Sequence, residues 1–260
     1  MKFGCVTTAS DYPLLLEAGF DYVELSGRSV CAMEKSAFEE LRRMIRSGGL
    51  NCLGFNAYCP QEVRIAGPGF SGRAAREYAL RCLSRAVDLN VQVVGVGSPM
   101  SRNLPQKYDQ NLAMRQAEEF FATTAEVFAT QSIYVCVEAL GNCYCNFINS
   151  LHEAQGLVRS VNMENLKLVA DFYNMEHSGE ADIPLSPFVS DIVHAHISDD
   201  AGSPQKRWFL KPEKRDQHVA RLRRLYAAGY LGAVTLETDL PADICEARQS
   251  LRMLREAAAT

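Results

Sequence analysis

Short apolar runs alternate with longer amphipathic stretches from one end of the chain to the other. Each run holds four to six residues, most of them apolar or β-branched. Continuous apolar runs of this length are typical of parallel strands that helices cover on the outer side. The pattern predicts eight strands, at Phe3–Thr7, Tyr22–Leu25, Cys52–Phe55, Val91–Val96, Ile133–Val137, Leu166–Ala170, Ile192–His196 and Ala233–Leu236.

The stretches between these runs carry apolar residues at helical spacing. In Leu151–Val161 the apolar positions recur three or four residues apart, which predicts one buried stripe along a helix. Gly19 and Gly229 follow two further helical segments, and we expect each glycine to end its helix in a left-handed conformation. The clearest predicted helices are Arg73–Val87, Asn111–Ala129, Leu151–Val161, His218–Ala228 and Ile244–Ala258.

The spacing of the strands favours a barrel. Consecutive strands begin 19 to 42 residues apart, so each interval can hold one crossover helix, and no linker divides the chain. We therefore predict an α/β protein with a single (β/α)₈ TIM barrel over residues 1–260, since a doubly wound open sheet usually has fewer strands. Loops rich in Gly, Pro, Ser and Asn follow four strands, and in a barrel they would gather at the mouth where active sites form. These loops are Asn56–Ser71, Gly97–Tyr108, Ala139–Asn149 and Ser198–Asp216.

Composition excludes several classes of protein. The chain has 260 residues, 47% of them hydrophobic and 22% charged, which excludes a disordered, collagen-like or coiled-coil protein. A formal net charge of -4 provides no general attraction for nucleic acid. We also see neither a secretory signal nor an apolar run long enough to span a membrane, so we expect a cytoplasmic protein. The nine cysteines are odd in number, and we expect reduced thiols.

Four consecutive predicted strands end in a residue that can bind a metal. These residues are Glu138, Asp171, His196 and Glu237, and they lie one strand-and-helix unit apart. A lone residue of this kind is usually a helix cap or a packed core side chain. Four together would point at one place on the barrel axis, where three carboxylates would repel one another unless a cation held them. The donor set suits one divalent ion, Mn²⁺, Mg²⁺, Co²⁺ or Zn²⁺, in an open site. His194 lies on the same strand face as His196, so the spacing alone allows either to be the ligand.

Several segments resemble a known family. The stretches VEALGN (from Val137), LVADFYNM (from Leu168), HAHISD (from His194) and GYLGAVTLET (from Gly229) are similar to the xylose isomerase-like TIM barrel superfamily, which includes sugar phosphate isomerases and epimerases. The segments AGFDYVEL and GVGSPMSR are similar too, so the resemblance covers nearly the whole chain.

The resemblance implies roles for individual residues. It makes Glu138, Asp171, His196 and Glu237 the metal ligands, with Glu138 and Glu237 also acting as the catalytic acid/base pair. It further implies that Asn174, His194 and Arg207 bind substrate. Asn174 stands where ketose epimerases have a histidine, which weakens assignment to that branch.

The implied function is a divalent-metal-dependent isomerase or epimerase of a small sugar or polyol carbonyl compound. It would abstract a proton alpha to a metal-bound carbonyl and pass through an enediolate. The main alternative is a lyase or dehydratase that uses the same metal site on a sugar, keto-inositol or glycoside. An apurinic endonuclease-like enzyme and a non-catalytic barrel are less favoured. We expect a carbohydrate substrate, neither nucleic acid nor membrane as partner, and leave homo-oligomerisation open.

Overall fold

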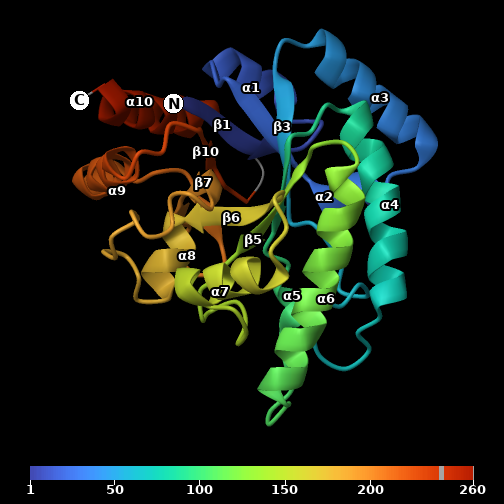
Figure 1. Cartoon of the computed structure of the whole chain (residues 1–260). Coiled ribbons are helices and arrows are strands. Elements are labelled where there is room, and N and C mark those ends of the chain that lie inside the picture. Colours follow the sequence, from blue (N-terminus) through green and yellow to red (C-terminus); the bar gives the residue numbers. More distant parts are fainter. Residues whose placement is uncertain (240–242, 260) are drawn as a thin grey trace.

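Eight parallel strands close into a barrel, and helices surround it (Figure 1). The structure is a computed structural model and describes residues 1–239 and 243–259. Around the ring the strand order is β1-β10-β7-β6-β5-β4-β3-β2, which confirms the predicted (β/α)₈ barrel. The strands are β1 (Lys2–Thr7), β2 (Tyr22–Ser26), β3 (Asn51–Asn56), β4 (Val93–Val96), β5 (Tyr134–Glu138), β6 (Leu166–Asp171), β7 (Ile192–Ile197) and β10 (Ala233–Leu236).

Helices follow the strands and form the outer layer in Figure 1. They are α1 (Tyr12–Ala18), α2 (Gly27–Ala32), α3 (Lys35–Ser47), α4 (Gly72–Asp88), α5 (Pro99–Arg102), α6 (Gln110–Ala129), α7 (Leu151–Val161), α8 (Phe172–His177), α9 (Arg215–Ala227) and α10 (Ile244–Ala259), with a short 3₁₀ turn at Pro212–Lys214. In the described part of the chain, none of these helices has the length and apolar character needed to cross a membrane.

Local sequence signals account for where individual helices begin and end. The Ser150 side chain accepts a hydrogen bond from the Glu153 amide, and the Glu153 carboxylate accepts one from the Ser150 amide, so α7 begins in a capping box. Leu151, Ala154, Leu157 and Val158 on α7 are buried and Val161 is half-buried, as the helical periodicity predicts. Gly19 has a φ of 91° and ends α1 in the predicted left-handed conformation.

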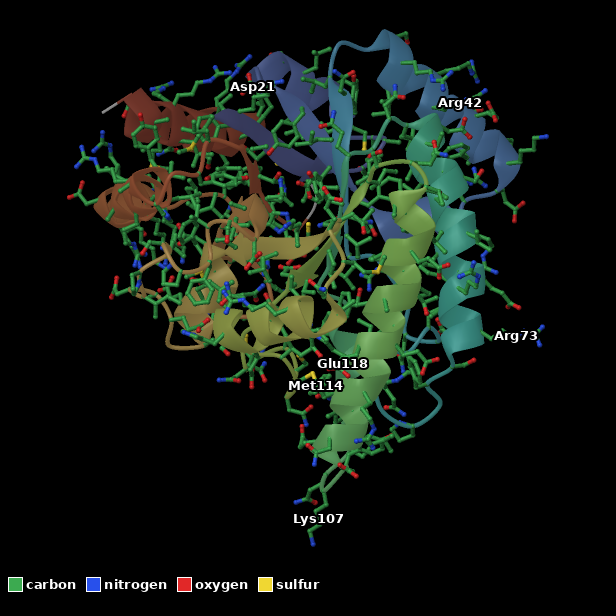
Figure 2. All side chains as sticks on the ribbon, in the orientation of Figure 1. Asp21, Arg42, Arg73, Lys107, Met114 and Glu118 are labelled. Atoms are coloured by element: carbon green, nitrogen blue, oxygen red, sulfur yellow. A yellow bond between two sulfur atoms is a disulfide. The ribbon has the colours of Figure 1, made fainter. Side chains whose placement is uncertain are left out.

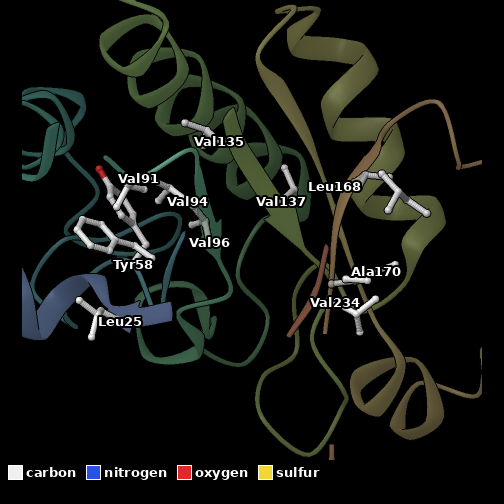
Figure 3. Close-up of a cluster of buried hydrophobic side chains, with 14 of the residues drawn as sticks. Leu25, Tyr58, Val91, Val94, Val96, Val135, Val137, Leu168, Ala170 and Val234 are labelled. Atoms are coloured by element: carbon white, nitrogen blue, oxygen red, sulfur yellow. The ribbon is translucent and has the colours of Figure 1, made fainter. Parts of the chain in front are cut away.

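The main core lies between the strands and the helices. Figure 3 shows valines of β4 and β5 in this layer, among them Val94 and Val135, both of which are fully buried. The charged side chains are mostly outside, as Figure 2 shows for Arg42 on α3 and Arg73 on α4. Burial of one face of each helix against the strands is the main favourable contribution to the fold.

The space enclosed by the strands is more polar than this outer layer. Its apolar part is small and contains the buried side chains of Val93, Cys136 and Val169. Beside them lie buried ionisable residues, Glu24 and His194. Polar groups inside a barrel need hydrogen-bond partners there, because water cannot reach them.

Two sequence-based expectations need correction. The segment Ser198–Asp216, which we expected to be a loop, contains a small antiparallel hairpin formed by β8 (Asp199–Asp200) and β9 (Arg207–Trp208). The expectation of reduced cysteines is wrong for Cys31 and Cys82, which form a disulfide between α2 and α4. These two helices pack together and bring the Cα atoms of the pair to 5.5 Å, within the range that a disulfide can bridge.

Candidate metal centre

The four predicted metal ligands converge at the C-terminal end of the barrel. Glu138 and Asp171 are the last residues of β5 and β6, His196 lies in β7, and Glu237 directly follows β10. One ligand atom from each residue lies within 4.8 Å of the others. His196 Nδ1 is 3.8 Å from Glu138 Oε1 and 3.5 Å from Glu237 Oε2. The sequence therefore predicts correctly which four side chains meet.

Strand register explains this convergence. Asp171 and Thr235 are the neighbours of His196 in the adjoining strands, so the carboxylate and the imidazole lie at the same height in the barrel. Gly97 leaves room for the third ligand, because a Cβ at this position would lie 2.5 Å from Glu138 Oε2. A side chain at Gly97 would therefore displace the Glu138 carboxylate.

One buried atom of the cluster, His196 Nδ1, has no hydrogen-bond partner among the described residues. Buried polar atoms are normally satisfied, so its lone pair is available to a cation. Three carboxylates and one imidazole form a donor set that suits a divalent ion of the first transition row or Mg²⁺. The geometry and chemistry of the cluster fit one divalent cation.

The positively charged side chain of Arg207 contacts the cluster directly. Its Nη1 lies 2.8 Å from Asp171 Oδ2 and 2.9 Å from Glu237 Oε2, and it donates a hydrogen bond of 3.1 Å to Ser198 Oγ. The guanidinium also lies over the Tyr173 ring, 4.8 Å from its centre. Arg207 thus partly neutralises two of the three carboxylates, and its guanidinium is held on several sides.

Two asparagines orient the carboxylates. Asn174 Nδ2 donates to Glu138 Oε1 at 3.0 Å and to Asp171 Oδ2 at 2.9 Å, while its Oδ1 accepts a hydrogen bond from the Gly141 amide. Asn56 Nδ2 donates to Glu237 Oε1 at 3.1 Å. Asn174 was predicted to bind substrate, but its amide is already committed to these two ligands.

The two glutamates differ in electrostatic environment. Burial raises the pKa of the Glu138 carboxyl to about 7, and the nearby carboxylates of Glu237 and Asp171 add to the rise, while the nearby His196 ring opposes it. Burial would also raise the pKa of Glu237, but the charges of Arg207 and His196 outweigh it and lower this pKa to about 2. In the absence of a bound cation, the Glu138 carboxyl, with its pKa near 7, is therefore partly protonated near neutral pH, whereas the Glu237 carboxyl, with its pKa near 2, is ionised.

A second buried group lies beneath the cluster and was missed from the sequence. Glu24, in β2, contacts the Nε2 atoms of both His194 and His196, the latter at 3.2 Å from Oε2. It also accepts a hydrogen bond from Thr235 Oγ1, which in turn lies 2.8 Å from Tyr22 Oη. The sequence did contain a signal for Glu24, because this residue interrupts an apolar strand run, and the four predicted ligands likewise interrupt or end such runs.

The geometry does not support the prediction that His194 binds substrate. Its Nε2 is occupied by Glu24 and by Thr235 Oγ1, at 3.0 Å from the latter. Its side chain is also absent from the described residues that line the cavity above the cluster. Of the two histidines, only His196 joins the group of four, while His194 and His196 together with Glu24 form a second group of possible metal ligands among the described residues.

A cavity of ≈ 400 Å³ opens above the cluster at the barrel mouth. Glu138, Glu237 and Arg207 line it, together with residues from the loops after the first four strands. Two of these loop residues, Ala57 after β3 and Ser98 after β4, have φ angles of 42° and 47°. Non-glycine residues adopt this region at a cost, and such positions are common beside functional sites.

Comparison with known proteins gives a consistent result. A family model described as xylose isomerase-like TIM barrel matches residues 13–257. No curated protein matches the sequence significantly. Among solved structures, D-psicose 3-epimerase from Clostridium cellulolyticum H10 with D-tagatose is similar, with a TM-score of 0.78, 17% identity and 99% coverage of both chains.

Two further solved structures are also similar. For the 3-keto-D-glucoside 4-epimerase from E. coli the TM-score is 0.76 and the identity 20%, with 98% of this chain and 99% of that chain covered. For the IOLI protein with a bound zinc atom the TM-score is 0.72 and the identity 16%, with 100% of this chain and 97% of that chain covered. At these identities the structural likeness shows a shared fold.

Proposed function

Because the chain belongs to the xylose isomerase-like TIM barrel family, we propose that it is a divalent-metal-dependent isomerase or epimerase of a small sugar or polyol carbonyl compound. The observation that carries the proposal is the pair Glu138 and Glu237. These two carboxylates share a candidate metal cluster, and both line the cavity in which a substrate would lie. The similar solved structures include two sugar epimerases and a protein with bound zinc, which supports the same class of activity.

Glu138, Asp171, His196 and Glu237 would hold the metal ion, with Mn²⁺, Mg²⁺, Co²⁺ and Zn²⁺ as the candidate ions. A divalent cation bound there supplies electrostatic stabilisation of the negative charge that develops on a substrate oxygen when the neighbouring carbon loses a proton. The open cavity above the cluster leaves space for that substrate.

The two glutamates would carry the proton. They come from β5 and from the end of β10, with β6 and β7 between them in the ring, so they approach the substrate from different sides. One carboxylate removes the proton alpha to the carbonyl group, and the carboxyl on the other side returns one, which inverts the carbon in an epimerase. Return of the proton to the neighbouring carbon gives an isomerase.

The surrounding residues would keep these carboxylates in place. Asn174 fixes Glu138, and Asn56 fixes Glu237, each through a side-chain hydrogen bond. Tyr144 lines the same cavity and its hydroxyl donates a hydrogen bond to the Pro204 carbonyl oxygen of the β8–β9 hairpin. This contact holds the hairpin that carries Arg207 close to the mouth and limits the access of water to the reacting carbon.

The first experiment measures bound metal in the purified protein, followed by exchange of substrate C–H for deuterium from D₂O across ketoses, keto-inositols and glycosides. We expect about one divalent ion per chain and exchange with at least one carbonyl substrate. Glu138→Gln should abolish the exchange, while Glu77→Gln on the exposed face of α4 should leave it unchanged. Absence of both metal and exchange would contradict the proposal.

Product analysis separates the proposal from its main alternative. An isomerase or epimerase gives a product of the same mass as the substrate, whereas a lyase or dehydratase gives a fragment or the loss of water. Both begin with the same proton abstraction, so deuterium exchange accompanied by a change of mass would move the assignment to the lyase class.

A further inference from the structure

The cavity extends well beyond the candidate metal cluster. One part of its wall is formed by Glu138, Glu237 and Arg207, and another by α2 and the segment after it, including Arg28, Ser29 and Met33. Its volume of ≈ 400 Å³ lies within the range of about 300–1,000 Å³ found for pockets that enclose drug-sized ligands. The candidate metal cluster and the wall on α2 therefore line one and the same cavity.

Two arginines line this cavity, and they differ in what they already bind. The Arg207 guanidinium contacts the carboxylates of Asp171 and Glu237 and the Ser198 hydroxyl. The Arg28 side chain is exposed at the rim of the cavity, and its guanidinium makes neither a hydrogen bond nor an ion pair within the described ranges 1–239 and 243–259. Arg28 therefore has all its side-chain donors available to a ligand in the cavity.

The lining residues beside Arg28 contain no carboxylate, although the Thr8 hydroxyl donates a hydrogen bond to Asp11 Oδ2 just outside the lining. The lining residues that come from β1, β2 and α2 are neutral except for Arg28, and the described acidic residues of the lining come from β5 and from the segment after β10. Hydroxyl groups of Thr8, Ser26 and Ser29 lie on the same wall. A guanidinium among hydroxyls is the kind of environment that binds a phosphate or carboxylate group.

The backbone holds Arg28 in place at this wall. Its amide donates to the Ala57 carbonyl oxygen at 3.2 Å, which ties the first turn of α2 to the end of β3. The Ser26 hydroxyl accepts a hydrogen bond from the Ser29 amide at 3.4 Å and caps the same turn. The backbone of Arg28 is thus fixed at the wall, while its exposed side chain is free to reach a ligand in the cavity.

We infer that Arg28 forms an oxyanion subsite and that the natural substrate is a sugar carbonyl compound with an anionic substituent, phosphate or carboxylate. The inference rests on the proposed function for the position of the sugar, because the reacting carbon must lie at Glu138 and Glu237. The anionic group lies on the α2 side of the cavity, away from the two glutamates. Arg28 binds and orients the substrate and takes no part in proton transfer.

Binding measurements test the subsite without any turnover. Calorimetry with the metal-loaded protein compares D-fructose with D-fructose 6-phosphate, D-fructose 1-phosphate and D-fructuronate, so that phosphate and carboxylate are separate arms. We expect at least one anionic compound to bind about tenfold more tightly than D-fructose, with a preference that weakens as salt rises. Arg28→Ala should remove this preference and leave the affinity for D-fructose within about twofold.

Controls distinguish a subsite from a general charge effect. Arg43→Ala removes an exposed arginine from α3, outside the cavity lining, and should leave the preference intact. Arg28→Lys should keep part of the preference for anionic compounds, because lysine retains the positive charge but lacks the two-pronged donor of arginine. Equal binding of charged and uncharged ketoses by the wild-type protein, or an unchanged preference in Arg28→Ala, would overturn the inference. Preferential binding without deuterium exchange would support the subsite and count against the proposed reaction.

Discussion

Replacement of Glu24 by glutamine tests whether the buried group beneath the cluster controls the candidate metal site. The two oxygens of Glu24 face three donors, the His194 and His196 ring nitrogens and the Thr235 hydroxyl. A glutamine has one acceptor oxygen and one NH₂ group in the same space. At least one of the three donors would then face another donor instead of an acceptor.

The expected loss of metal affinity follows from the contact with Glu24 that His196 loses in this variant. Its Nε2–H is now directed at Glu24 Oε2, 3.2 Å away, which leaves Nδ1 facing Glu138 and Glu237 as the atom available to a metal. Partners that fix a ligating histidine in this way typically contribute about 10–100-fold in metal affinity. We therefore expect Glu24→Gln to weaken Mn²⁺ binding by at least about tenfold, or roughly 1.4 kcal/mol.

The assay is calorimetric titration of the metal-free protein with Mn²⁺, with a thermal melt of each variant to confirm that it is folded. Tyr22→Phe serves as the control, since it removes the outermost hydroxyl of the same chain of contacts and leaves the contact between Glu24 and His196 in place. We expect this variant to bind Mn²⁺ within about twofold of wild type. A folded Glu24→Gln protein with wild-type Mn²⁺ affinity would refute the argument.

Three further predictions concern charge, pH and the disulfide. Arg207→Ala should lower the melting temperature by several degrees in EDTA and by much less with saturating Mn²⁺, because the metal then neutralises the carboxylates that Arg207 contacts; equal losses in both buffers would contradict this. Burial would raise the pKa of Asp199, but hydrogen bonds from His218, the Lys211 amide and Lys214 together outweigh it and lower this pKa to about 2. The stability that ionised Asp199 contributes is present above about pH 4 and is lost as the pH falls towards 2. Asp199→Asn should therefore reduce the drop in unfolding free energy between about pH 4 and pH 2, measured by urea titration at each pH. The Cys31–Cys82 disulfide spans 51 residues, and serines at both positions should cost up to about 4 kcal/mol of unfolding free energy in urea, whereas an unchanged midpoint would show that the bond does not stabilise the native protein.

The sequence predicts the barrel strands well because their apolar runs are local features. Strand β10 has the predicted bounds, and the largest shift at a strand start is two residues, at β4, where the run begins before the ladder does. The cluster is predictable for the same reason. Each ligand interrupts or ends an apolar run, and the barrel topology then brings the ends of neighbouring strands together.

The remaining features of the site depend on contacts between distant segments. Nothing in the local sequence around Arg207 indicates that its guanidinium reaches Asp171, because the hairpin that carries it is positioned by contacts such as that between Tyr144 and Pro204. Arg28 appears from the sequence as an ordinary surface charge. Its place in the cavity wall follows only when the first turn of α2 is fixed to the end of β3.

Closure of the barrel has a consequence for the order in which the protein can become active during synthesis. β1 pairs with β10, so that Gly4 and Cys5 lie beside Thr235 and Leu236, immediately before Glu237. The strand that sets the height of this glutamate is therefore synthesised well before the glutamate itself. If the four side chains hold a metal as proposed, Glu138, Asp171 and His196 would be made before the fourth ligand. Full metal affinity would then require the pairing of β1 with β10, and metal uptake would report closure of the barrel.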